Sequence, residues 1–228
     1  MVRIQHGKRY RADLKKVPDG ALEMGEAVKA LRQFDQTKFD QTVELSLWLG
    51  IDPKQSDQRV RGSMSLPHGI GKTRKVVAFC DQGQVEEATA AGAVEAGSDE
   101  LIEKIQKGWT DFDVAVATPA MMRSVSRLGR ILGPQGKMPS PKAGTVVEDV
   151  AAAVTEYAAG KIEFRNDDGG NIHAPVGKLS FSDTDLAENI EALLAKIRSM
   201  RPAACKGQYF KKAHLSATMT PSVRLAVE

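Results

Sequence analysis

Cysteine, histidine and aromatic residues are scarce in this chain of 228 residues. Two cysteines and four scattered histidines form no spacing typical of a zinc site. Cys80 and Cys205 lie far apart in the sequence, and we expect free thiols in a reducing compartment. No apolar run approaches the roughly 20 residues of a membrane helix, and no apolar segment follows the basic N-terminus. We therefore predict a cytoplasmic protein without a metal, a cofactor or a membrane segment.

Motifs of catalysis are also missing, since the chain has no Gly-x-Ser-x-Gly, His-Glu-x-x-His or Cys-x-x-Cys. Residues 66–73 end in Gly-Lys-Thr like a phosphate-binding loop, but Leu66 occupies the first glycine position and an apolar strand follows where a helix is needed. Arg74 likewise occupies the third glycine position of a dinucleotide fingerprint. His68 and His173 have no nucleophile at a recognisable spacing, so hydrogen-bonding roles are favoured. We predict that the chain is not an enzyme.

Charge is nearly balanced overall, with a net charge of +3, but it is unevenly distributed. The first sixteen residues form a basic arm that contains a single acid, Asp13. Its cations are Arg3, Lys8, Arg9, Arg11, Lys15 and Lys16. Residues 81–113 are acidic, with only Lys104 and Lys107 opposing nine carboxylates. A polyanion can face only the first of these regions. The acids are interpreted as solvated helix faces, and a protein-binding role for them stays open.

The two ends of the chain share one style of pattern. Apolar residues at helical spacing predict a helix from Met24 to Phe34, and alternation predicts a strand over 42–48. Residues 50–73 are rich in Gly, Pro, Asp and Ser and are interpreted as loop rather than core. Later segments predict antiparallel strands at 162–165 and 172–181 around a turn at 166–170, a helix at 183–200 and a strand at 213–219. The N-terminal elements are too few for a core, so we expect them to pair with the C-terminal strands.

The middle of the chain alternates strands with helices. Strands are predicted at 75–80, 93–96 and 113–118, and helices at 84–91 and from Ser98 or Asp99 to Trp109, with Pro119 as the first residue of another helix. This order predicts a parallel sheet with helices on both faces. The predicted fold class is α/β (α+β) with two domains. Residues 1–67 and 159–228 form a discontinuous domain with an antiparallel sheet, and residues 68–158 form an inserted Rossmann-like domain. An enzyme built on the inserted sheet is the competing hypothesis, which titration with nucleotides would test.

A dense Gly/Pro loop with several cations spans residues 128–146. Glycines let a backbone approach a ligand closely, prolines lower the entropy lost on ordering, and cations contact phosphates. From the residues alone, a long interdomain connector with solvated charges is an equally good interpretation.

This loop resembles the signature of the family of large-subunit ribosomal protein one, the ribosomal stalk protein, in its bacterial type. The usual signature reads LGPRGLMPNPKxGTV, and Gln135 and Ser140 here replace its Arg and Asn. Further segments resemble the family in the same order along the chain, namely 6–10, 38–44, 49–53, 61–72, 108–113 and 172–178. The resemblance therefore covers essentially the whole sequence.

The resemblance implies both a fold and a function. It implies a first domain made of both termini, an inserted Rossmann-like domain, and a structural protein of the large ribosomal subunit that is a monomer when free. Its expected partners are large-subunit rRNA at the mobile stalk, deacylated tRNA leaving the exit site, the leader of its own mRNA, whose translation it would repress, and other large-subunit components.

Carried over by position, the resemblance implies an RNA-binding surface on the first domain. Its residues would be Lys38, Phe39, Thr42, Glu44, His173, Lys178, Thr218, Met219 and Thr220. Thr42 and Glu44 alternate with Val43 and Leu45, so their polar side chains are free to hydrogen-bond 2′-hydroxyls and base edges. For Phe39 and Met219, core packing is the interpretation that composition alone would favour. Many relatives have glycine where this chain has Thr220, and a stiff β-branched residue there puts close backbone approach to RNA in doubt.

Overall fold

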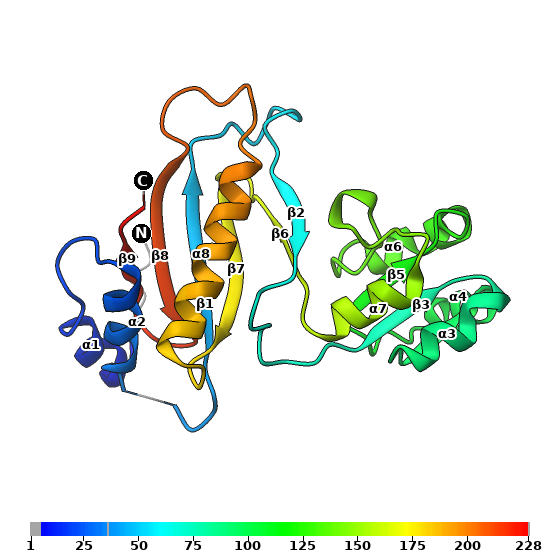
Figure 1. The fold of residues 1–228 in the computed structure, drawn as a ribbon, viewed down its shortest axis with the longest axis horizontal. Helices are drawn as coiled ribbons and strands as arrows, with labels where there is room; N and C mark the ends of the chain where they lie inside the picture. The colour runs from blue at the N-terminus through cyan, green and yellow to red at the C-terminus, as the bar shows by residue number, and fades with distance from the viewer. Residues whose placement is uncertain (1–5, 36, 228) are drawn as a thin grey trace. The chain divides into compact units, whose positions relative to one another are not determined.

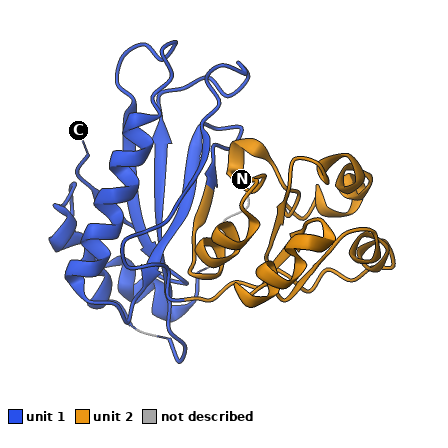
Figure 2. Ribbon diagram, turned by 45° about the vertical axis from the view of Figure 1, so that its right-hand side comes forward, with its two compact units in different colours: residues 1–71, 164–228 blue, residues 72–163 orange. Residues whose placement is uncertain are grey.

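The computed structural model describes residues 6–35 and 37–227, which form two compact units (Figure 2). Unit 1 consists of residues 1–71 and 164–228, and unit 2 consists of residues 72–163. The predicted class is confirmed, because one antiparallel sheet and a separate parallel sheet are present together with helices. Whether each unit folds independently stays a prediction.

Among its described residues, unit 1 contains three helices and an antiparallel sheet of four strands in the order β7-β1-β8-β9 (Figure 1). Its helices are α1 (Lys8–Leu14), α2 (Met24–Arg32) and α8 (Asp183–Ser199), and the strands of the sheet are β1 (Thr42–Leu49), β7 (Asn171–Lys178), β8 (Phe210–Ala217) and β9 (Val223–Leu225). The expected pairing of the two chain ends is confirmed, since β1 lies between β7 and β8.

Alternation in these strands separates a buried face from an exposed one. Val43, Leu45 and Leu47 of β1 are almost fully buried, as are the corresponding residues of β7 and β8. The buried face packs against α2 and α8, and α8 lies in front of β1 and β7 in Figure 1. A strand with period-two alternation places its polar residues on the opposite face. We call that polar side of the four-stranded sheet the open face.

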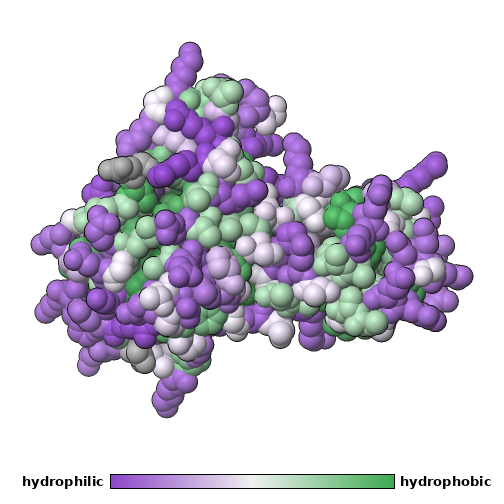
Figure 3. Space-filling view, in the orientation of Figure 1, coloured by the Kyte–Doolittle hydropathy of each residue, from purple (hydrophilic) through white to green (hydrophobic). Residues whose placement is uncertain are grey.

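Helix α8 forms because its local signals agree with its apolar stripe. The Ser182 side chain accepts a hydrogen bond from the Asp185 backbone N–H at 3.1 Å, and acids occupy the first turn, where the helix dipole favours them. Leu186, Ile190 and Leu193 recur at helical spacing and are fully buried. Figure 3, drawn in the orientation of Figure 1, shows hydrophilic side chains projecting from the surface on the side where α8 lies in front of the sheet.

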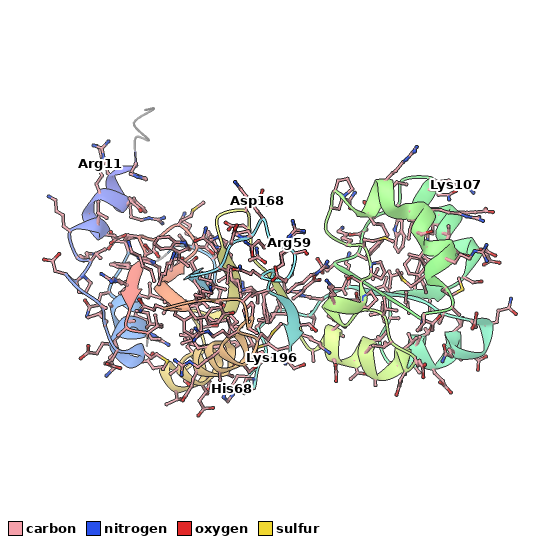
Figure 4. The ribbon with its side chains drawn as sticks, turned by 90° about the horizontal axis from the view of Figure 1, so that it is seen from above. Arg11, Arg59, His68, Lys107, Asp168 and Lys196 are labelled. Carbon is pink, nitrogen blue, oxygen red and sulfur yellow. The ribbon has the colours of Figure 1, made fainter. Side chains whose placement is uncertain are left out.

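The basic arm is partly helical, because α1 includes Lys8, Arg9 and Arg11, and Arg11 projects from it (Figure 4). Its acid Asp13 is fully buried and accepts a hydrogen bond from the Asp35 backbone N–H at 3.0 Å, and Lys16 pairs with the Asp35 carboxylate at 2.9 Å, so the arm is tied to the segment that follows α2. Arg3 lies outside the described residues.

Two details of unit 1 differ from prediction. The strand at 162–165, β6 (Ile162–Arg165), does not form a hairpin ladder with β7; it pairs with β2 (Arg61–Met64) in a two-stranded sheet, and only an isolated bridge joins Asn166 to Ile172. Residues 50–73 were predicted as loop, but they include β2 and the buried residues Val60, Leu66 and Ile70. A four-residue strand with mixed burial carries too little alternation to be recognised.

Unit 2 has a parallel sheet with the order β4-β3-β5. Its elements are β3 (Val76–Phe79), the 3₁₀ turn η1 (Gln82–Gln84), α3 (Val85–Ala90), β4 (Glu95–Gly97), α4 (Asp99–Gln106), β5 (Val114–Ala117), α5 (Met122–Val125), η2 (Ser126–Leu128), α6 (Gly129–Leu132), η3 (Pro141–Ala143) and α7 (Val150–Ala158).

Helices cover both faces of this sheet, as predicted. Val77 and Phe79 of β3 pack with α4, α5 and α6, whereas Val76 and Ala78 pack with α3 and α7. Both neighbours of β3 are parallel to it, so the strand is buried on two sides and is continuously apolar. Pro119 does not begin a helix, since α5 starts at Met122, and the strand expected at 93–96 is shifted to Glu95–Gly97.

Candidate nucleic-acid interface

The open face is built from the outward side chains of β7, β1, β8 and β9. Its members are Asn171, His173, Pro175 and Lys178 of β7, Thr42, Glu44, Ser46 and Trp48 of β1, Lys211, Lys212, His214 and Ser216 of β8, and Arg224 of β9. Cations outnumber the single carboxylate of this set, Glu44, so the face suits a polyanion.

Two β-bulges decide which cations reach the open face. The pairing of β1 with β7 shifts between Val43 and Glu44, so that Lys178 lies opposite Thr42 on the outer side. The pairing of β1 with β8 shifts between Trp48 and Leu49, so that Lys211 and Lys212 are both exposed beside Trp48. A bulge inserts one residue and thereby re-aims the side chains around it.

At the Thr42 end of the open face, three of the predicted residues form one network. The Thr42 backbone N–H donates to Thr218 Oγ1 at 3.2 Å, and the Thr218 N–H donates to the Thr42 carbonyl at 3.0 Å. Lys178 Nζ donates to Thr42 Oγ1 at 2.9 Å. Gln41, which no sequence pattern indicated as part of the site, is 2% exposed, and its amide donates to the Thr218 carbonyl at 2.6 Å. These bonds hold the ends of three strands in register.

Phe39 and Met219 flank this network as exposed apolar side chains. Phe39 is 49% exposed and Met219 is 65% exposed, so the alternative of core packing is wrong for both. Lys38 is also exposed, and Thr37 Oγ1 donates to the Phe39 carbonyl at 2.9 Å. Large apolar side chains left in water beside a cation are available to a ligand.

Thr220 closes the turn after β8 through its own hydroxyl. Thr220 Oγ1 accepts from the Ala217 backbone N–H at 3.1 Å and donates to the Ala217 carbonyl at 3.0 Å. The left-handed residue of this turn is Met219, with φ 67°, and its carbonyl accepts from Arg9 at 3.2 Å. A glycine at position 220 is therefore not needed here for a positive φ, and the threonine hydroxyl is engaged within the turn.

The middle of the open face is polar. Glu44 is exposed between Pro175 and Ser216, and His173 Nδ1 lies 3.0 Å from Ser46 Oγ. Asp167, whose carboxylate lies 3.9 Å from His173 Nε2, has a pKa lowered by a side-chain hydrogen bond from Asn171 and by backbone N–H donors. The structure thus brings Thr42, Glu44, His173, Lys178 and Thr218 onto one face.

His68 is not part of the open face. Its Nε2 lies 2.6 Å from Glu188 of α8, and this contact is the main cause of its raised pKa (Figure 4). The segment 66–73 leads into β3, as predicted, so no helix faces its glycines. The hydrogen-bonding role predicted for this histidine is confirmed.

The Gly/Pro loop 128–146 lies inside unit 2, so the alternative of an interdomain connector is wrong. Leu128, Leu132 and Ala143 are fully buried, and Lys137 donates to the Thr110 carbonyl at 2.9 Å. The loop therefore contributes core residues as well as exposed cations.

Over residues 6–35 and 37–227, no group of three or more His, Cys, Asp or Glu side chains is arranged to hold a metal ion. Within the same ranges, no helix combines the length and the apolar character of a membrane span. Cys80 and Cys205 are free and buried, and burial raises the pKa of the Cys80 thiol.

Comparison with known proteins gives one family. The model of the ribosomal protein L1p/L10e family matches residues 31–221, a range that contains all nine predicted RNA-binding residues. The chain is 52% identical to the large ribosomal subunit protein uL1 of Kosmotoga olearia, over 97% of this chain and 96% of that one. It is 55% identical to the protein of that name from Rhodopirellula baltica, over 96% and 97%, and 50% identical to that from Lactobacillus acidophilus, over 97% and 96%.

Proposed function

Since the chain belongs to the ribosomal protein L1p/L10e family, we propose that it is a structural component of the large ribosomal subunit that binds rRNA through the Thr42 end of the open face. The family is one of ribosomal proteins rather than enzymes, in agreement with the prediction. The observation that carries the proposal is the position of Phe39 and Met219, two exposed apolar side chains beside the network of Thr42, Lys178 and Thr218.

The chemistry of this end fits folded RNA. An A-form helix presents 2′-hydroxyls and base edges in a wide, shallow minor groove, which a flat sheet face can approach. Thr42, Glu44 and Thr218 supply hydroxyl and carboxylate groups for those hydroxyls, and Lys38 and Lys178 supply cations for phosphates. Phe39 and Met219 supply apolar contact to ribose and base. Because Lys178 and Thr218 already bond to Thr42, the polar groups are ordered before RNA arrives, which lowers the entropic cost of binding.

We further propose, from the resemblance alone, the finer parts of this role. The RNA would be the mobile stalk of the large subunit, and the stalk would assist the release of deacylated tRNA from the exit site. The same surface would bind the leader of the protein's own mRNA and repress its translation. The working compartment is then the cytoplasm, and the free protein is a monomer.

The proposal is tested by Phe39→Ala in a filter-binding assay with stalk-region rRNA, competitor tRNA and a salt series. Full burial of a phenylalanine contributes about 1.5–3 kcal/mol. Phe39 is 49% exposed in the free protein and this surface is open for RNA to cover, so we expect a loss of about 1 kcal/mol or more in binding free energy. The melting temperature should change little, because the ring is not part of the core.

Val94→Ala is the matched control, because Val94 of unit 2 is 50% exposed and lies outside the open face. It should leave RNA affinity unchanged. Wild-type affinity for stalk rRNA no better than for random RNA would refute the proposed function.

A further inference from the structure

The end of the open face opposite Thr42 carries an exposed tryptophan. Trp48 is the last outward residue of β1 and is 39% exposed, between Asn171 of β7 and Lys212 of β8. Trp48 lies six positions along the extended strand from Thr42, a distance of about 20 Å. A ligand group at Trp48 is therefore distinct from one at the Thr42 end, although both lie on the same strand.

Two ammonium groups lie over the Trp48 ring. Lys211 Nζ is 4.7 Å and Lys212 Nζ is 5.6 Å from the ring centroid, and the β-bulge at Trp48 and Leu49 is what exposes these consecutive lysines together. In the described part of the chain, neither ammonium forms an ion pair with a carboxylate. Their charge is therefore available to an anion.

A second tryptophan shows what ordinary packing of this kind looks like. Lys104 Nζ lies 4.6 Å from the Trp109 ring centroid in unit 2, but Lys104 is paired with Glu95 and α4 carries further acids. Trp109 also packs against the core of its unit. At Trp48, by contrast, the two lysines have no carboxylate partner among the described residues, and the tryptophan is still 39% exposed. Packing of lysine stems on an indole thus explains Trp109 but leaves the Trp48 cations unaccounted for.

We propose that Trp48, Lys211 and Lys212 bind an unpaired nucleotide of a single-stranded RNA segment that continues from the folded RNA at the Thr42 end. The base stacks on the indole in place of the two ammoniums, which move from the ring to the flanking phosphates. Every base has a π-face, so such a site is tolerant of sequence and sensitive to salt. Arg224 of β9, which lies opposite His214 of β8, adds a further cation to this face, which favours a polyanion over an acidic peptide of low charge density. This inference rests on the proposed function for the folded part of the RNA.

The direct test is a fluorescence titration of the Trp109→Phe protein, in which Trp48 is the sole tryptophan. The probe is decaadenylate RNA. We expect saturable quenching that weakens as salt rises, and at least about 5-fold weaker binding in Lys211→Gln/Lys212→Gln. Unchanged fluorescence would overturn the inference. So would quenching by decaglutamate without quenching by decaadenylate, which would assign the site to an acidic peptide.

A second experiment separates this site from the Thr42 end. Affinity is measured for the stalk rRNA fragment alone and with a ten-adenylate tail on either end. The tail should tighten the binding of RNA to the wild-type protein by at least about 5-fold. Trp48→Ala should remove that gain in affinity, whereas Trp48→Phe should keep most of it. Phe39→Ala should weaken the binding of the tailed and the untailed fragment equally. A tail that adds nothing overturns the inference alone, whereas failure of the untailed fragment to bind overturns the proposed function. Circular dichroism melts identify any variant that fails to fold.

Discussion

Asn189 of α8 is predicted to be a main determinant of the stability of unit 1. Its side chain is fully buried and makes three hydrogen bonds. Oδ1 accepts from the His68 backbone N–H at 3.1 Å, and Nδ2 donates to the carbonyls of Gly69 at 3.1 Å and Val176 at 2.8 Å. One amide thus ties the helix to β7 and to the segment that leads toward unit 2.

Replacement of this residue by alanine leaves one N–H and two carbonyls without these partners. A typical hydrogen bond contributes about 1 kcal/mol net, and a buried group left unsatisfied costs about 1–3 kcal/mol. Because His68 is partly exposed, water can reach part of the site, so we expect Asn189→Ala to lower the free energy of unfolding by about 2–4 kcal/mol.

The assay is urea unfolding in the Trp109→Phe background, since Trp48 then reports unit 1 alone and avoids mixing two transitions. Glu191→Ala, an exposed change on the same helix, is the control and should stay within about 0.5 kcal/mol of wild type. RNA affinity of folded Asn189→Ala should be unchanged, because α8 lies on the buried side of the sheet. A loss below about 1 kcal/mol would refute the reasoning, since it would mean that the three bonds are replaced at little cost.

Two further predictions concern the open face and the domain division. The pKa of His214 is lowered first by burial and then by Arg224 and Lys212, so the folded state takes up this proton less readily than the unfolded state. The associated stability is complete above the ordinary value of about 6.5 and is lost as pH falls through the folded pKa. Bound RNA phosphates should oppose the charges of Arg224 and Lys212 and raise the pKa of His214, as followed by NMR of the imidazole. A pKa unchanged by RNA would contradict RNA contact with the β8 and β9 side of the open face. Residues 1–67 joined to 159–228 should fold alone and retain most of the rRNA affinity, which a gel-shift titration measures against the full chain, and an unfolded product would refute the predicted domain boundaries.

The elements that sequence predicts well are those in which one period persists. β1 alternates over eight residues, and α8 repeats its apolar stripe over 17 residues, so both were predicted within two residues of their observed ends. β3 was recognised because it is buried on both sides and is continuously apolar. In β1 and α8 the burial pattern extends over enough residues to separate the strand period of two from the helix period of about 3.6.

Short elements were predicted poorly because their partners, rather than their own residues, determine them. β9 has three residues and was not predicted, yet it completes the sheet by pairing with β8. β6 has the right residues for a strand, but its partner is β2, a strand hidden in a segment rich in Gly, Pro, Asp and Ser. Pairing over such distances is decided by the packed fold and leaves no local signal.

The open face was the part least accessible to periodicity, although it is the part proposed to bind RNA. In β7, Ile172, Ala174 and Val176 are buried, so unbroken alternation would place Lys178 in the core. The bulge beside Val43 reverses this parity and brings Lys178 to Thr42, a position that family resemblance implied and alternation contradicted. The bulge beside Trp48 similarly exposes Lys211, for which no resemblance had suggested a role. The register shifts that bring these cations to the surface are therefore found in the paired strands of the structure, and the alternation of the sequence alone does not predict them.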